Sequence, residues 1–195
     1  MRLFTGLDLP LEVVRALDTL LDRLRPAARL KWSPPANLHI TTHFIGEWPE
    51  DRLQDLRTAL GGLPGHPPIA IHVRKLGFFP NPHSPRILSA GVEASPDLAA
   101  LAAETDRALE PLGLEPEGRP FSPHLTLARI KEPVPLQNLR ETIAALPSLD
   151  FGSFSADRFF LYRSRPGPAG SVYTKLAEFP LSNQAIGGIM GQGEM

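Results

Sequence analysis

Residues 37–46, with the sequence NLHITTHFIG, and residues 123–130, with the sequence PHLTLARI, share one pattern. Each stretch places a histidine two residues before a threonine inside an apolar run: His39 before Thr41, and His124 before Thr126. Short apolar runs of this kind predict β-strands. Side chains two apart on a strand point to the same face, so each copy predicts an imidazole and a hydroxyl side by side. Their separation along the strand is about 6–7 Å.

Two such strands facing each other would combine two imidazoles with two hydroxyls. An unperturbed histidine titrates near pH 6.5, so one ring of a pair can be neutral and the other protonated near neutral pH. The pair can then supply both the base and the acid of a hydrolysis, while the hydroxyls donate to an anion. The pattern therefore indicates cleavage of a phosphodiester without a metal.

The composition is that of a folded globular protein. Hydrophobic residues make up 42% of the 195 residues and charged residues 21%. A formal net charge of −1 argues against a large basic surface for duplex nucleic acid, but leaves room for a local basic pocket. The absence of cysteine excludes disulfides, thiolate chemistry and cysteine-based zinc sites. We find no apolar stretch long enough for a signal peptide or a membrane span, so we expect a cytoplasmic protein with no membrane partner.

Periodicity predicts the secondary structure as follows. Apolar residues three and four apart predict helices over residues 11–24, 50–60, 95–109 and 136–146. Apolar or alternating runs predict extended segments over residues 2–9, 30–33, 38–45, 69–76, 86–92, 121–130, 157–162 and 171–179. Residues 78–85 are proline-rich and predict a loop. We expect one bilobal domain over residues 1–182 and a flexible, glycine-rich tail over residues 183–195.

The order strand, helix, strands, helix occurs in each half of the chain, with one motif strand in each. This repetition predicts an α+β fold with two pseudo-symmetric antiparallel sheets and outer helices. The two motifs would face each other across a central cleft.

The chain also resembles a known family over most of its length. The similarity rests on residues 2–10, Trp32 with residues 37–41, residues 79–80, 85–88 and 91–92, residues 119–129, and Ser164, Gly170, Tyr173 and Leu181. With these residues the chain resembles the two-histidine phosphoesterase superfamily, and within it the bacterial and archaeal RNA 2′,3′-cyclic phosphodiesterases, also called 2′-5′ RNA ligases. Two departures are Thr42, where the family usually has an aliphatic residue, and Ser89, where it often has an aromatic one; they bear on substrate contacts more than on the chemistry.

The resemblance implies the roles of five residues. It makes His39 and His124 catalytic, Thr41 and Thr126 phosphate-binding, and adds Arg129 as a further substrate-binding residue. The family's usual description makes His39 the acid and His124 the base, although pseudo-symmetry prevents the sequence from separating them.

The resemblance further implies a bilobal fold, a monomer, and neither metal nor cofactor. The implied reaction is hydrolysis of RNA or nucleotide 2′,3′-cyclic phosphates to 2′-phosphomonoesters. A weak 2′-5′ joining of RNA ends is also implied. Whether ATP or GTP occupies the cleft stays open.

Several residues keep two interpretations. On a regular strand, His43 shares the face of His39 and Thr41, so it is either substrate-binding or a solvated histidine at the cleft edge. His39 and His43 would lie about 13 Å apart, too far to share one metal ion held at about 2 Å by each ligand. On a regular strand, an offset of five turns Arg129 away from the face of His124, so its role requires a bend or a long reach.

The aromatic residues Phe4, Trp32 and Phe79 could stack on a base, although a place in the core is the more common use. Two other functions stay open. One is hydrolysis of a small cyclic nucleotide or of ADP-ribose cyclic phosphate, and the other is non-catalytic binding of RNA ends.

Overall fold

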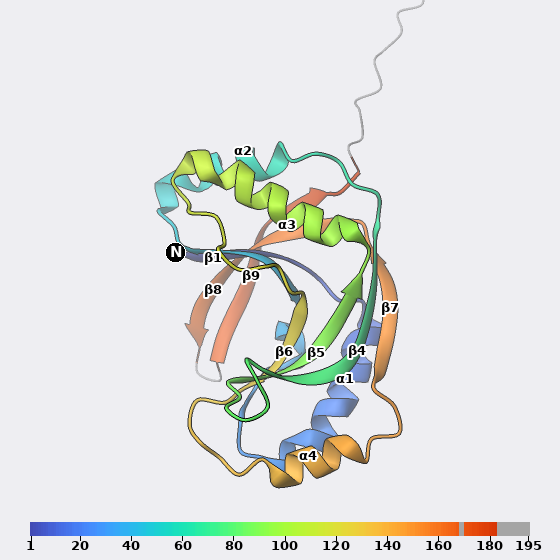
Figure 1. Cartoon of the computed structure of the whole chain (residues 1–195). Helices are drawn as coiled ribbons and strands as arrows, with labels where there is room; N and C mark the ends of the chain where they lie inside the picture. Colours follow the sequence, from blue (N-terminus) through green and yellow to red (C-terminus); the bar gives the residue numbers. More distant parts are fainter. Residues whose placement is uncertain (168–169, 183–195) are drawn as a thin grey trace, which may run out of the picture.

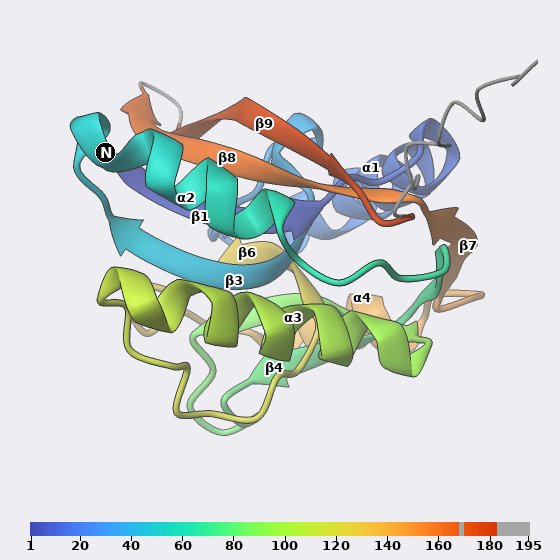
Figure 2. The same ribbon diagram turned by 90° about the horizontal axis from the view of Figure 1, so that it is seen from above.

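The structure is a computed structural model in which residues 1–167 and 170–182 are described. It contains two antiparallel sheets, with strand orders β3-β1-β8-β9 and β2-β6-β5-β4-β7 (Figures 1 and 2). The predicted α+β fold with two antiparallel sheets is confirmed. The strands are β1 (Arg2–Leu7), β2 (Lys31–Trp32), β3 (Ile40–Glu47), β4 (Ile69–Phe79), β5 (Ile87–Ala94), β6 (His124–Arg129), β7 (Asp150–Ala156), β8 (Arg158–Gly167) and β9 (Gly170–Pro180).

Four α-helices lie in two pairs at opposite ends of the molecule, α2 with α3 and α1 with α4 (Figure 1). They are α1 (Leu11–Leu24), α2 (Leu53–Gly61), α3 (Pro96–Leu109) and α4 (Gln137–Ala144). None of the helices in the described part of the chain is long and apolar enough to cross a membrane.

The two sheets do not correspond to the two halves of the sequence. The four-stranded sheet joins β1 and β3 from the N-terminal part to β8 and β9 from the C-terminal part. Helix α1 follows β1 but packs on β7 of the other sheet, and α3 follows β5 but packs on β3 of the four-stranded sheet. Each sheet is therefore covered in part by a helix that directly follows a strand of the other sheet in the sequence.

Helix α3 shows why these segments fold as predicted. Pro96 occupies its first position, where the missing N–H costs no helical hydrogen bond. The buried residues of α3 recur at helical spacing: Leu98, Leu101, Ala102, Thr105 and Leu109. The same spacing buries one face of α1: Val13, Leu17, Leu20, Leu21 and Leu24.

One strand was missed, and several boundaries differ from the prediction by a few residues. Strand β7 was not predicted, because its seven residues include a glycine and two serines, which weaken the strand pattern. Strand β4 runs on through Phe79, where the proline-rich segment predicted a loop, because it keeps its pairing with β5. The motif strands begin later than predicted, at Ile40 and at His124. The predicted tail, residues 183–195, lies outside the described residues.

Candidate active site

His39 lies one residue before β3, and its ring is fixed by two hydrogen-bonding contacts. Nδ1 lies 2.7 Å from the carbonyl oxygen of Asn37, so Nδ1 carries the proton that is donated to this oxygen. Nε2 lies 3.0 Å from the hydroxyl oxygen of Thr41, which donates to it when the ring is neutral. The contact with Asn37 thus leaves Nε2 as the nitrogen that can exchange a proton with a substrate.

The ring of His39 also rests on aromatic side chains from the other strands of its sheet. It stacks on Phe4 of β1 with ring centres 4.7 Å apart, and the edge of Tyr173 of β9 approaches at 5.1 Å. Phe4 in turn stacks on Tyr162 of β8 at 4.9 Å. Phe4 is only 3% exposed, so the interpretation of Phe4 as a core residue holds. Its ring packs against one face of the His39 ring.

His124, in the second sheet, repeats the Nδ1 contact of His39. Its Nδ1 lies 2.9 Å from the carbonyl oxygen of Ser122, two residues earlier, just as His39 contacts Asn37. His124 is exposed, whereas His39 is partly buried. The two motifs therefore hold their rings by the same local device but in different surroundings.

A β-bulge follows each motif at the same position. In β3, Gly6 of β1 pairs with Thr41 and the preceding residue of β1 pairs with His43, which leaves Thr42 as the extra residue. In β6, Ser89 pairs with Thr126 and Leu88 with Ala128, so Leu127 is extra. Both motifs thus consist of a histidine, one intervening residue, a threonine and a bulge.

The bulge at Leu127 explains how Arg129 reaches the motif face. Leu127 and Ala128 are both fully buried, which breaks the alternation of a regular strand, and Arg129 is exposed like His124. The expectation that an offset of five turns Arg129 away from His124 holds only for a regular strand, and β6 is not regular. The charge of Arg129 also acts on His39, so the two lie within electrostatic reach of each other.

Charged groups of the second motif influence the pKa of the histidine in the first motif. Burial lowers the pKa of His39, and this is the largest influence on it. The Asn37 carbonyl and the charge of Asp8 act in the opposite direction, while Arg129 and His124 lower the pKa further. The ligand-free site therefore favours the neutral form of His39 more than water does. Strands β3 and β6, which come from different sheets, are also in contact.

Asp8, which follows β1, takes part in the network beneath His39. Its carboxylate accepts hydrogen bonds from the Tyr162 hydroxyl and the Lys175 ammonium group. Burial and the Asp8 carboxylate raise the pKa of the Tyr162 hydroxyl. These partners lie more than 150 residues from Asp8, so no local pattern could have found them.

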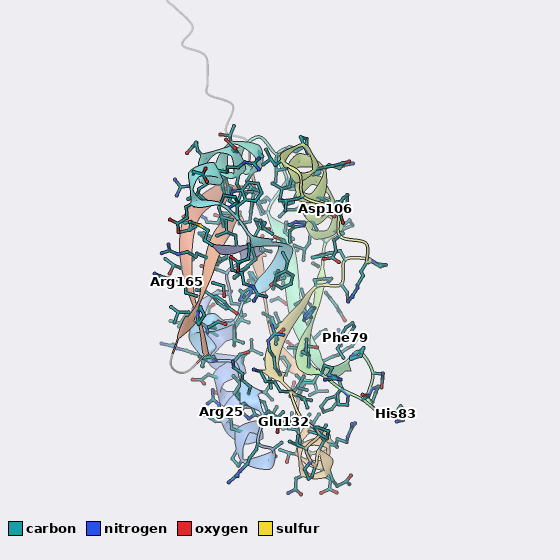
Figure 3. The ribbon with its side chains drawn as sticks, turned by 90° about the vertical axis from the view of Figure 1, so that its left-hand side faces the viewer. Arg25, Phe79, His83, Asp106, Glu132 and Arg165 are labelled. Atoms are coloured by element: carbon teal, nitrogen blue, oxygen red, sulfur yellow. The ribbon has the colours of Figure 1, made fainter. Side chains whose placement is uncertain are left out.

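His43 was predicted to share the face of His39 and Thr41 on condition that the strand is regular, and the strand is not regular before His43. The bulge at Thr42 precedes it, and both side chains are buried. Nδ1 of His43 lies 2.6 Å from a carboxylate oxygen of Asp106 on α3 (Figure 3 labels Asp106). Burial lowers the pKa of His43, against the influence of Asp106. A solvated histidine at the cleft edge does not fit this environment, and substrate contact by His43 stays a prediction.

Ser33 is a residue of the site that sequence reasoning missed. Its hydroxyl donates to the carbonyl oxygen of Thr126 at 2.7 Å, and its N–H donates to that of Leu127 at 2.8 Å. Ser33 thereby holds the backbone of the second motif at its bulge.

The two other aromatic residues that could stack on a base differ in exposure. Trp32 is partly buried and donates its ring N–H to the Ala28 carbonyl oxygen, whereas Phe79 is 55% exposed.

Among residues 1–167 and 170–182, no three histidine, aspartate or glutamate side chains lie close enough to hold a metal ion.

Comparison with known proteins gives consistent results. An RNA 2′,3′-cyclic phosphodiesterase of Methanothermobacter thermautotrophicus is 34% identical over 182 residues, covering 92% of this chain and 98% of the relative. The crystal structure of a Thermus thermophilus protein superposes with a TM-score of 0.79 at 35% identity, covering 94% of this chain and 100% of the other. That of E. coli LigT complexed with 3′-AMP gives 0.73 at 26% identity, covering 92% and 97%. Residues 13–168 match the family described as the 2′-5′ RNA ligase superfamily, and the chain belongs to this family.

Proposed function

We propose that this protein hydrolyses 2′,3′-cyclic phosphates at RNA ends to 2′-phosphomonoesters by metal-independent acid–base catalysis. The observation that carries the proposal is the repeated motif geometry. His39 and His124 each use Nδ1 to contact the carbonyl two residues earlier, which leaves both Nε2 atoms for proton transfer. The Methanothermobacter relative is named for this activity, and LigT forms a complex with 3′-AMP.

The proposed reaction transfers one proton at each histidine. Nε2 of His124 takes a proton from water, and the water oxygen bonds to phosphorus. The bond between phosphorus and the ribose 3′-oxygen breaks, and Nε2 of protonated His39 donates a proton to that oxygen. The products are a 2′-phosphate and a free 3′-hydroxyl. When the 5′-hydroxyl of a second RNA end takes the place of water, the same proton transfers form a 2′-5′ phosphodiester and release the 3′-hydroxyl, which is the proposed ligase activity.

Three further side chains would stabilise the charge on the non-bridging oxygens. The hydroxyls of Thr41 and Thr126 follow their histidines by two residues, and Arg129 follows the bulge of the second motif. A hydroxyl can donate one hydrogen bond, and a guanidinium group offers a planar pair of charged donors. Donors placed where negative charge develops commonly contribute several kcal/mol, roughly 2.7–4 for one such donor.

The assignment of His39 as acid requires that it be protonated in the complex. Burial lowers its pKa in the free protein, but a bound cyclic phosphate carries a negative charge that raises it. Substrate binding and protonation of His39 are therefore coupled, and catalysis by this route does not require His39 to be charged beforehand.

The test is turnover of a short RNA with a 2′,3′-cyclic phosphate in the presence of a chelator, with 2′- and 3′-phosphate products separated. We expect a 2′-phosphate product and a 10²–10⁴-fold loss of kcat, roughly the contribution of one acid or base, in His39→Ala and in His124→Ala. The matched control is His72→Ala, since His72 lies on β4 and pairs with Asp150. No turnover between pH 5 and 9, turnover only after a metal is added, or equal losses in all three variants would contradict the proposal.

The domain range of residues 1–182, the monomeric state, the cytoplasmic location and the binding of ATP or GTP stay predictions. Gel filtration of the purified protein tests the monomeric state, and competition of ATP with the cyclic-phosphate RNA tests the binding of ATP.

A further inference from the structure

A hollow of about 180 Å³ lies beside Arg129, on the side of the second motif strand. Its apolar floor comes from Leu30, Ile130 and Val134, and its one acidic side chain is Glu132 (Figure 3 labels Glu132). The remaining lining residues are four cations, namely Arg29, Lys31, Arg129 and Lys131.

The pairing of β2 with β6 explains why the cations gather here. Lys31 pairs directly with Arg129 in this antiparallel ladder. Arg29 lies two residues before Lys31, and Lys131 lies two residues after Arg129, so both are close to this pair along the chain. All four cations are exposed and line the same hollow.

This arrangement is unfavourable for the protein alone. Like charges directly opposite each other on a sheet are destabilising. The hollow holds four cations and one acid, whereas the whole chain has a formal net charge of −1. None of the four cations forms an ion pair with any residue of the described ranges, while cations elsewhere, such as Arg52, Lys75 and Arg158, do. An anionic ligand would relieve the repulsion.

Arg129 connects the hollow to the proposed reaction centre. Its charge acts on His39, and it also lines the hollow. The side chain of Lys31 reaches toward Gly170 of the β8–β9 hairpin, which belongs to the other sheet. Arg129 is therefore shared by the hollow and the proposed reaction centre.

We propose that the hollow binds the backbone phosphates of the RNA chain that precedes its cyclic end. The inference rests on the function proposed above and adds to it a binding site for the RNA chain beside the reaction centre. The enzyme recognises an oligonucleotide by its chain, through Arg29, Lys31 and Lys131, and not only by its terminal nucleotide. A cyclic mononucleotide has no such phosphates and gains nothing from the hollow.

The experiment compares a 2′,3′-cyclic mononucleotide with a hexanucleotide RNA that ends in the same cyclic nucleotide. In Arg29→Ala/Lys131→Ala, we expect KM for the hexanucleotide to rise while kcat and KM for the mononucleotide stay unchanged. Each lost phosphate contact reduces the salt dependence of binding by about 0.7 in log–log slope, so the double variant should lose about 1.4. Arg107→Ala is the control, since Arg107 is exposed on α3, next to Asp106 at the other end of the molecule (Figure 3).

Two results would overturn the proposal: an unchanged KM and salt slope for the hexanucleotide, or an equal rise of KM for both substrates. Binding separates this test from that of the catalytic function. If the wild-type protein hydrolyses neither substrate, fluorescence anisotropy with a labelled hexanucleotide ending in a 3′-phosphate still measures the hollow. Weaker binding in the double variant than in Arg107→Ala supports the hollow as a site for RNA phosphates, and equal binding refutes it.

Discussion

Replacing Thr42 by valine removes one partner of a buried hydrogen bond and leaves the other partner in place. The hydroxyl oxygens of Thr5 on β1 and Thr42 on β3 lie 2.7 Å apart, and the two residues are 0% and 4% exposed. Valine matches threonine in shape, so packing changes little. The cost is the desolvation of the Thr5 hydroxyl, about 1–3 kcal/mol. For a chain of this length, 1 kcal/mol lowers Tm by roughly 2–4 °C, so we expect a fall of about 2–12 °C.

Replacing both threonines by valine should recover most of this loss, because no buried polar group is then left without a partner. The assay is urea unfolding of Thr42→Val, Thr5→Val and the double variant, analysed as a double-mutant cycle. Thr58→Val is the control, since the Thr58 hydroxyl is exposed and bonds to Gln54 within α2. A single variant within about 0.5 kcal/mol of wild type, or a double variant as unstable as the sum of the singles, would refute the reasoning.

Three further predictions concern His39. A Cβ at Gly6 would lie 2.7 Å from the Ile40 carbonyl oxygen, so Gly6→Ala should shift the backbone of the first motif and lower kcat by about tenfold or more. Gly77 has open space where its Cβ would lie, so Gly77→Ala should leave kcat unchanged. Burial lowers the pKa of His39 in the folded protein below the value of 6.5 that it has in the unfolded chain, so the unfolded chain binds a proton first as pH falls. The folded protein therefore loses stability as pH falls below 6.5. His39→Gln should therefore reduce the loss of stability between pH 7 and pH 5 in urea unfolding. Asp8 raises the pKa of His39, so Asp8→Asn should lower it further in an NMR titration, and an unchanged or higher pKa would contradict this assignment.

The helices and the motif strands could be predicted because their signals are local. The buried face of α3 follows from residues three and four apart, and Pro96 marks where the helix begins. The positions of His39 and His124 follow from two copies of one short pattern. Each of these signals lies within a stretch of fifteen residues or fewer.

The bulges and the support of His39 could not be predicted, because they depend on partners far along the chain. Thr42 is an extra residue only relative to β1, and Leu127 only relative to β5. The bulges at these two residues interrupt the regular alternation just before His43 and Arg129, and the one at Leu127 is a bend of the kind that a role for Arg129 requires. Tyr162 and Tyr173, which hold the ring of His39 in place, belong to strands that begin more than a hundred residues after it.

The exchange of helices and strands between the two sheets has a consequence for synthesis on the ribosome. Strand β1 lies between β3 and β8, so one of its edges has no partner until residues near 160 have been translated. The aromatic support of His39 is completed only when Tyr173 has emerged. A chain that stops before β8 therefore carries both histidines but lacks half of the first sheet, and we expect the nascent protein to acquire its proposed reaction centre among its last steps of folding.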